Sequence, residues 1–429
     1  MAEPINEKEA NPSAVSDDVK RSHDHSAEEA GRIEQPQSWK YKQVKIGGLR
    51  LPFYASPPVQ LGIVAVVCFL CPGMFNALTG MGGGGNVDPH AADSANTALY
   101  STFAVIGFFA GTFTNVLGVK FTLSFGGLGY CVYIASFLCY KYTGNFGFCV
   151  FAGALLGVCA GLLWCAQGTI MMSYPPEGAK GRYISWFWMI FNLGAVIGSL
   201  VSSLLFIFGF YLFIQCLTIK QIPLGQNIHV TSNSTVSTGT YVGFLVLTTL
   251  GAILAWSLVS AKSVVRADGS RVILMKNPTW WTEVYGLWET FQSDPYILLL
   301  FPMFFASNWF YTYQFNDING AKFDTRTKAL NNTLYWLMQI VGAFTFGYAL
   351  DRPWLARRIR ARVCWAVLFT ITMAIWGGGY AFQKNYTRED AAQKNFPIYD
   401  WTSNGYVGPM FLYMFYGFYD AAWQTSVYW

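Results

Sequence analysis

Residues 146–172 read FGFCVFAGALLGVCAGLLWCAQGTIMM, and this stretch decides the fold class. It contains no Asp, Glu, Lys or Arg, and its apolar side chains would cover every side of a helix. A helix of this length would be about 40 Å long, which exceeds the roughly 30 Å hydrocarbon core of a bilayer. The stretch therefore predicts a membrane-spanning helix.

The same pattern recurs along most of the chain after residue 50. Of the 429 residues, 53% are hydrophobic and only 12% are charged, about half the usual charged share of a globular protein. Strands of a membrane barrel would alternate polar and apolar residues over about ten positions, which these longer runs do not do. We therefore expect an all-α polytopic membrane protein with ten spans, near 59–79, 98–119, 121–140, 146–172, 183–208, 240–261, 295–316, 330–350, 363–383 and 406–428.

The charges outside these spans predict the orientation. Residues 1–50 form a polar tail that we expect to be disordered, and its last part carries four basic residues without an acid. The positive-inside rule then places the N-terminus in the cytosol. With this threading, the three Asn-x-Ser/Thr sequons lie on outer loops, and Asn233, on the longest loop, is the glycosylation candidate.

The spans group into two bundles joined by a linker. Residues 51–261 hold six spans, 262–294 form a cytosolic linker, and 295–429 hold four spans of a second bundle that we expect to be truncated. Within the linker, apolar residues at helical spacing predict a helix lying on the membrane surface: Trp281, Val284, Tyr285, Trp288 and Phe291. A partner-docking face is the alternative for this helix.

Two short motifs follow the second and the eighth predicted spans. The matched glycines, Gly111 and Gly347, are 236 residues apart (347 − 111), and so are Asn115 and Asp351 (351 − 115). A repeat at equivalent positions predicts two homologous bundles around a central cavity. A carboxylate at such a turn can cap a neighbouring helix. The residues assigned to these conformational loops are Gly111, Asn115, Gly118, Lys120, Gly347, Asp351 and Arg352.

Both motifs resemble the cytosolic loop motif of the major facilitator superfamily, although the first copy has Asn115 where that motif has Asp. Longer stretches resemble the fungal branch of the Unc-ninety-three-like family: 72–85, 153–157, 161–168, 172–175, 180–183 and 188–194. That resemblance implies the two-bundle fold with twelve spans, of which this chain would hold ten. It also implies either solute transport or, as in animal members, regulation of potassium channels or trafficking of membrane receptors.

Uncharged amides and one acid within the spans are the candidates for a substrate cavity. Because a carboxylate in a span is costly, Asp420 should face a cavity or a partner, either coupling proton movement or remaining as a neutral, hydrogen-bonded acid. The amides can bind a polar ligand, or they can simply join helices. The candidate cavity residues are Asn76, Gln167, Asn192, Asn308, Gln314 and Asp420.

Enzyme chemistry finds no support in the sequence. The four histidines all lie outside the spans, and no cluster suits a metal or a cofactor, so we expect neither. The expected partners are the lipid bilayer and an unidentified small solute or ion, with no nucleic acid. The leading hypothesis is a secondary transporter working by alternating access; the alternative is a non-transporting regulatory or trafficking subunit of another membrane protein.

Overall fold

The computed structural model describes residues 38–429 except 44, 47–48, 83–87, 177–178, 201–235, 237, 267–268, 271, 273–279, 307, 309, 354, 392 and 394–395. Nearly all of this part is helical. Eight of its helical stretches are long and apolar enough to cross a membrane. The chain is therefore an integral, multi-pass membrane protein of the all-α class.

The first half of the chain begins with a short turn and a hairpin. η1 (Trp39–Tyr41) precedes β1 (Lys45–Ile46) and β2 (Leu49–Arg50), which pair antiparallel. The helices that follow are α2 (Pro57–Leu70), α3 (Pro72–Thr79), α5 (Pro89–Leu117), α6 (Val119–Thr143), α7 (Phe146–Ser173), α8 (Lys180–Leu200) and α11 (Thr238–Leu254), with the short turns η5 (Ala255–Ser257) and η6 (Ala261–Ser263).

The second half has fewer long helices. It comprises α12 (Trp280–Ser293), η7 (Pro295–Leu300), α13 (Phe301–Ala306), α14 (Phe310–Thr312), the π-helical turn η8 (Tyr313–Gly320), α15 (Thr325–Asp351), α16 (Arg357–Gln383), α17 (Arg388–Ala391) and α18 (Val407–Tyr428). Beyond the pair β1 and β2, there is an isolated parallel bridge between Phe323 and Tyr399.

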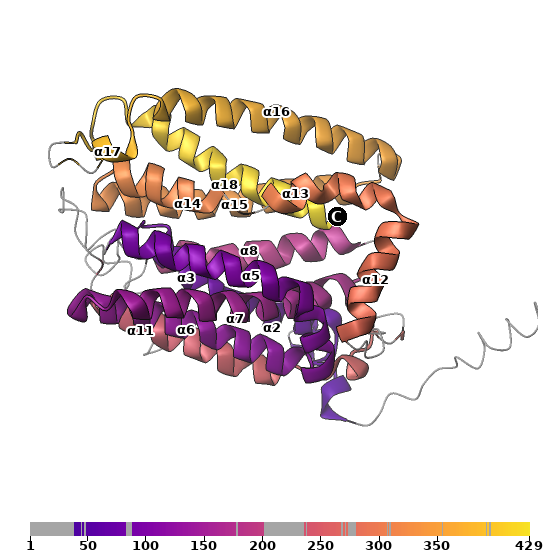
Figure 1. Cartoon of the computed structure of the whole chain (residues 1–429). Helices are drawn as coiled ribbons and strands as arrows, with labels where there is room; N and C mark the ends of the chain where they lie inside the picture. The colour runs from indigo at the N-terminus through magenta and orange to yellow at the C-terminus, as the bar shows by residue number, and fades with distance from the viewer. Residues whose placement is uncertain are drawn as a thin grey trace, which may run out of the picture.

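The long helices run side by side in two halves (Figure 1). The helices from α2 to α11 lie in one half, and those from α13 to α18 lie in the other. α8 and α15 form the close contact between the halves. Gly347 has no side chain, so α15 approaches Ser185 on α8 so closely that an added Cβ atom would lie 2.5 Å from the Ser185 Cβ. α12 lies across one end of the molecule and connects the halves, roughly perpendicular to the spans (Figure 1).

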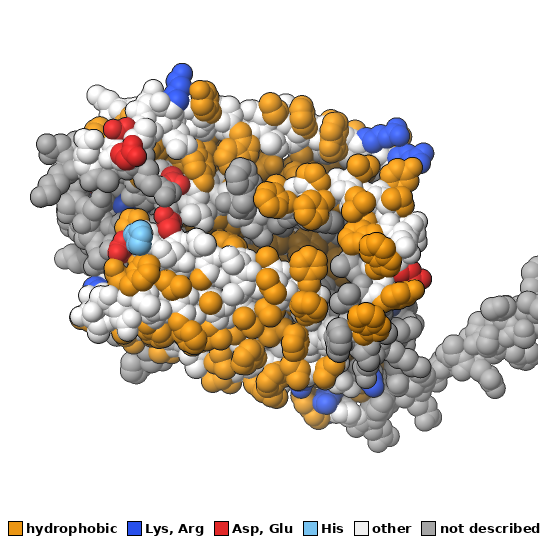
Figure 2. Space-filling view, in the orientation of Figure 1, with side chains coloured by type: hydrophobic (Ala, Val, Ile, Leu, Met, Phe, Trp, Pro, Cys, Tyr) orange, Lys and Arg blue, Asp and Glu red, His pale blue; other side chains and the backbone are white. Residues whose placement is uncertain are grey.

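The outer surface explains how this molecule meets its solvent. Large apolar side chains are exposed along the spans, for example Val105 and Phe108 on α5 and Trp365 and Met373 on α16. They cover the middle of the face shown in Figure 2, while the Lys and Arg side chains gather toward the two ends. Since lipid tails are as apolar as these side chains, this surface suits a bilayer.

Two differences from the sequence expectations concern the spans. The expected span at 295–316 is broken into η7, α13, α14 and η8, and 406–428 forms the single helix α18, which is not among the eight apolar helices. Four tyrosines, Gln424 and Asp420 make α18 more polar than its neighbours. The prediction of one span at 295–316 therefore missed the breaks in that helix. At 406–428 the predicted helix is present as α18, with 22 residues, and its polar groups lower its hydropathy.

The tail also differs in its last part. Residues 1–37 lie outside the described residues, but the segment from Trp39 is folded against the first half instead of disordered. The Tyr41 hydroxyl donates to the Ser263 carbonyl at 2.8 Å, and the Ala55 amide donates to the Lys40 carbonyl at 3.0 Å. In the linker, the expected helix is present as α12, and its Trp281, Tyr285 and Trp288 side chains are exposed; its place on the membrane surface stays a prediction.

Candidate functional site

A kink in the first span turns polar groups toward the centre of the molecule. Pro72 begins α3 directly after α2, and because proline has no amide hydrogen it interrupts the helical ladder there. The helix axis therefore changes direction at Cys71, between α2 and α3. After the kink, the side chains of Phe75, Asn76 and Thr79 lie on the inner side of the first half.

A second break lies opposite, in the second half. Asn308 falls between α13 and α14, and α14 continues into the π-helical turn η8. π-Helical turns are rare and are found frequently at functional sites. Non-helical backbone at membrane depth is tolerated where it lines a cavity, and Asn308, between α13 and α14, lines one here.

A cavity of about 230 Å³ lies between these two breaks. Both halves contribute to its walls, and Figure 2 shows apolar side chains deep in a hollow between them. The polar lining residues are Asn76, Thr79, Asn96, Asn308, Thr312, Asn316 and Gln424. The aromatic ones are Phe75, Tyr100, Phe103, Tyr130, Tyr133, Trp164, Trp188, Phe191, Tyr311, Phe315 and Tyr428.

Of the six residues predicted from the sequence to line this cavity, Asn76 and Asn308 do so. The other four are fully buried at helix contacts outside its lining: Gln167, Asn192, Gln314 and Asp420. Gln167 donates to the Met171 sulfur at 3.3 Å, and Gln314 accepts from the Tyr335 hydroxyl at 3.0 Å. Asn192 has no hydrogen-bond partner among the described residues.

Asp420 stands directly behind the cavity wall. One carboxylate oxygen accepts from the Tyr311 hydroxyl at 2.6 Å and from the Gln339 amide at 2.5 Å, and the Tyr335 hydroxyl lies 3.3 Å away. The other oxygen is buried with no partner among the described residues. Tyr311 lines the cavity, so a single hydroxyl separates this acid from the cavity.

Several lining residues were missed from the sequence. Asn96 lies two residues before the predicted start of the second span, because α5 begins already at Pro89, capped by Asp88. Asn316 lies in the π-helical turn, where helical spacing does not predict its direction. The proline after Asp88 was a usable start signal for the first of these, since proline suits the first turn of a helix.

The two halves are held together at the end of the molecule where α3 ends and α15 begins. Asn319 donates to the Gly80 carbonyl at 2.8 Å, and Asn332 donates to the Ala77 carbonyl at 3.0 Å. Asn316 also donates to the Asp93 carboxylate at 2.6 Å. Each of these contacts joins the first half to the second, so this end must separate if the cavity is to open there.

The repeated motifs lie at the opposite end. Asp351 accepts from the backbone amide of Arg182 at 2.7 Å, in the first turn of α8, so it caps a helix of the other half. In the first copy, Gly118 has a φ of +81°, which favours glycine, and the turn allows α6 to start immediately after α5. Lys120 donates to the Trp256 carbonyl at 3.4 Å.

Removal of the Asp351 cap has a defined expected cost. We expect Asp351→Ala to lower stability by about 1 kcal/mol, because the first turn of α8 loses a charged acceptor between the halves. The change appears as a lower Tm of the detergent-solubilised protein. Asp351→Asn keeps an acceptor oxygen and should retain most of the stability; equal losses in both variants would contradict the capping role.

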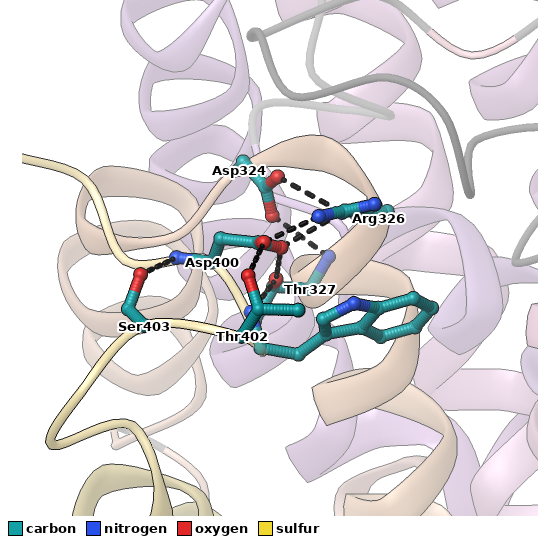
Figure 3. A network of polar contacts seen from close by, with 7 residues as sticks. Asp324, Arg326, Thr327, Asp400, Thr402 and Ser403 are labelled. Atoms are coloured by element: carbon teal, nitrogen blue, oxygen red, sulfur yellow. Dashed lines mark hydrogen bonds and ion pairs between the residues drawn. The ribbon is translucent and has the colours of Figure 1, made fainter.

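A polar network fixes the loop between α16 and α18 (Figure 3). Arg326 binds both carboxylate oxygens of Asp400, with Nε to Oδ1 at 2.7 Å, and Thr327 and Thr402 donate to the same carboxylate. Asp324 caps α15 by accepting from the Thr327 amide at 3.0 Å. The Arg326 guanidinium holds the pKa of the Asp400 carboxyl well below its usual range.

This network predicts a specific pH dependence. Because the folded-state pKa of Asp400 is lowered, its stabilising contribution is full above the unfolded pKa of about 3.9 and is lost as the pH falls toward the folded value. Asp400→Asn should therefore have a lower Tm than the wild type at pH 7, and the difference should shrink below about pH 4. Glu389→Gln, exposed on the same loop, is the control; an equal Tm difference at pH 7 and pH 3 would contradict this role.

The sequons differ in accessibility. Asn331 is buried and bonded, since it donates to Asn319 at 3.0 Å and accepts from Tyr406 at 2.7 Å. Asn385 is exposed after the end of α16. Asn233, the glycosylation candidate, lies outside the described residues.

Comparison with known proteins gives a consistent picture. Residues 61–427 match the family model of the Major Facilitator Superfamily. An UNC93-like protein of Schizosaccharomyces pombe is 50% identical over 392 residues, covering 91% of this chain and 73% of the relative. UNC93-like protein 1 of Arabidopsis thaliana is 41% identical over 376 residues, covering 88% of this chain and 77% of the relative.

Solved structures agree on the fold. The E. coli fucose:proton symporter FucP has a TM-score of 0.52 at 14% identity, with 87% of this chain and 84% of that chain covered. The E. coli xylose transporter XylE, in a partially occluded inward-open conformation, has a TM-score of 0.51 at 12% identity, with 87% and 85% covered. At such identities the similarity concerns the fold alone.

Proposed function

This chain belongs to the major facilitator superfamily and, within it, to the UNC93-like proteins, and we propose that it is a secondary transporter of a small solute. The observation that carries this proposal is the cavity of about 230 Å³ with walls from both halves. A solute bound there contacts both bundles at once, so its binding energy can bias their relative position.

In this proposal the bundles 51–261 and 295–429 move against each other. Opening at one end breaks the bonds from Asn319 and Asn332 to the first half, and opening at the other end breaks the Asp351 cap on α8. Each end relies on a small set of polar bonds, which exchange with water at modest net cost when an end opens. Alternating access needs two seals of this kind.

Asp420 supplies a site for a coupling proton. Its second carboxylate oxygen is buried without a partner among the described residues, which is costly for a charged carboxylate and favours uptake of a proton. The Tyr311 hydroxyl binds the first oxygen and lines the cavity. A solute that displaces or reorients Tyr311 therefore changes the environment of the acid, which couples solute binding to protonation.

Charge distribution supports the orientation proposed from the sequence. The end that carries α12 also carries Arg357, Arg358, Arg360 and Arg362 at the start of α16, and positive charge favours the cytosolic side. The first described turn, η1, contacts the linker on that side, since the Tyr41 hydroxyl donates to the Ser263 carbonyl. The chemistry of the cavity is binding chemistry, so no enzymatic step is proposed.

Transport is tested by reconstitution of the full-length protein into proteoliposomes that contain a pH-sensitive dye. A panel of sugars, amino acids and organic cations is added outside, and solute-driven proton movement and counterflow are recorded. Asn76→Trp, which fills the cavity, should abolish the signal, whereas Val105→Trp on the lipid-facing side of α5 should not. Absence of flux with every panel member, together with a stoichiometric membrane partner on purification, would favour the regulatory subunit instead.

A further inference from the structure

The charge of the cavity lining limits the solutes that it can hold. Among the residues that the structure describes, no Asp, Glu, Lys, Arg or His lines the cavity. Asp420 and Asp93 lie one side chain behind the wall, and each is already bonded, Asp420 to Tyr311 and Asp93 to Asn316. A charged solute would lose its hydration without meeting an opposite charge, and that loss costs several kcal/mol.

The aromatic rings of the cavity come from both halves. On one wall, Trp164 stacks near Trp188 with ring centroids 6.2 Å apart, and Phe75 meets Tyr133 at 5.1 Å. On the other wall, Tyr311 stacks on Phe315 at 5.5 Å. The Trp164–Trp188 and Tyr311–Phe315 pairs are stacked and present flat apolar surfaces, whereas Phe75 meets Tyr133 edge to face. A solute with flat apolar faces suits such walls.

Neutral amides supply the polar contacts. The Asn76 side chain is partly exposed in the cavity, and no hydrogen bond involves it in the described part of the chain. Opposite, Asn308 and Gln424 bond each other at 3.2 Å, which leaves the Asn308 amino group and the Gln424 carbonyl open. Each wall thus offers both a donor and an acceptor, as a solute with several hydroxyl groups requires.

The volume of the cavity suits a small solute. A cavity of about 230 Å³ holds roughly eight water molecules at about 30 Å³ each. Bonded atoms pack more closely than separate waters, so a solute of about a dozen heavy atoms fits. A six-membered polyhydroxylated ring has this size, with apolar C–H faces and hydroxyl groups around its rim.

We propose that the cavity binds an uncharged, ring-shaped polyol of monosaccharide size. This inference rests on the proposed transport function and names its substrate class. The aromatic rings of the cavity pack against the apolar faces of the solute. Asn76 on one wall and the Asn308–Gln424 pair on the other form hydrogen bonds with its hydroxyl groups. Because the contacts come from both halves, the solute is held only when the halves close around it.

Neutral, cationic and anionic derivatives of the same sugar rings test this ligand class. The purified full-length protein is titrated with D-glucose, D-galactose, D-mannose and myo-inositol, with their available amino derivatives (glucosamine, galactosamine, mannosamine), and with their carboxylates (glucuronate, galacturonate). Binding is read from thermal shift and calorimetry. At least one neutral ring should bind, and its charged counterparts should bind at least about tenfold more weakly, a difference of about 1.4 kcal/mol.

Three outcomes overturn the class. Tighter binding of an amino derivative means that the carboxylate behind Tyr311 selects cations, and tighter binding of a carboxylate contradicts the charge argument outright. Absence of binding by every neutral ring also overturns the ligand class. A specific variant sharpens the result: Asn76→Ala should weaken the neutral ligand about tenfold, because one wall loses its free amide, whereas Asn385→Ala outside the cavity should leave affinity unchanged.

The ligand class and the transport function can be contradicted independently of each other. Binding of a neutral ring without flux in proteoliposomes keeps the assigned ligand class and contradicts the transporter. Flux of a charged solute, without binding of any neutral ring, supports transport and overturns the ligand class. The two results are distinct, because binding is measured in detergent and flux is measured across a membrane.

Discussion

Asp420→Asn is expected to abolish proton-coupled flux in proteoliposomes and reduce it to the level of protein-free vesicles. The side chain keeps its size and an acceptor oxygen for Tyr311 and Gln339, but an amide cannot take up and release a proton. Counterflow of solute without a pH gradient should persist, since the cavity itself is unchanged. Proton uptake and counterflow measured on the same vesicles separate these two effects.

The control for this result is Asp294→Asn, an exposed carboxylate that caps η7 and does not line the cavity. It should transport as the wild type does. Proton-coupled flux that survives in Asp420→Asn would show that this acid is a neutral, hydrogen-bonded structural group, the other role that its place in a span allows. In that case the coupling site would lie elsewhere or coupling would be absent.

Gly157→Ala is expected to destabilise the protein by about 3 kcal/mol or more, which is the upper end of the usual cost of overpacking. A Cβ atom at this position would lie 1.9 Å from the Thr102 hydroxyl and 2.2 Å from the Leu99 carbonyl on α5. The Thr102 hydroxyl donates to the Ala154 carbonyl at 2.9 Å, so the same change breaks a bond between α5 and α7.

The matched control is Gly168→Ala, on the same helix, where nothing lies within 4 Å of the added atom. This variant should be unchanged or slightly more stable, because alanine favours a helix by about 1 kcal/mol over glycine. Thermal unfolding in detergent compares the two. A Tm for Gly157→Ala that equals that of Gly168→Ala would mean that α5 and α7 do not pack as closely as described.

The spans could be predicted because hydropathy reports the solvent of each segment. α7, at Phe146–Ser173, agrees with the expected 146–172 to one residue. The segment 295–320 could not be resolved in this way, since an apolar composition does not reveal that the helix breaks at Asn308 and widens into a π-turn. Such breaks depend on tertiary contacts with α18, as in the bond from Gln424 to Asn308.

The candidate site was predicted in part. Asn76, about one turn after the kink at Pro72, and Asn308, at the break between α13 and α14, both line the cavity. Gln167 and Asn192 are equally polar, yet they lie at helix contacts, because a sequence shows that a residue is unsuited to lipid but not which protein surface it faces. The position of Asp420 behind Tyr311 could be seen only once α14 and α18 were placed side by side.

Alternating access requires a cavity that opens in turn to both sides of the membrane, and labelling of one introduced cysteine tests this most directly. Thr79→Cys places a thiol in the cavity lining, where the described part of the parent chain has no cysteine. Vesicles of both orientations are treated with a membrane-impermeant thiol reagent, with the parent chain as background. The account predicts labelling above background in both orientations; labelling in one orientation only, or in neither, would contradict it.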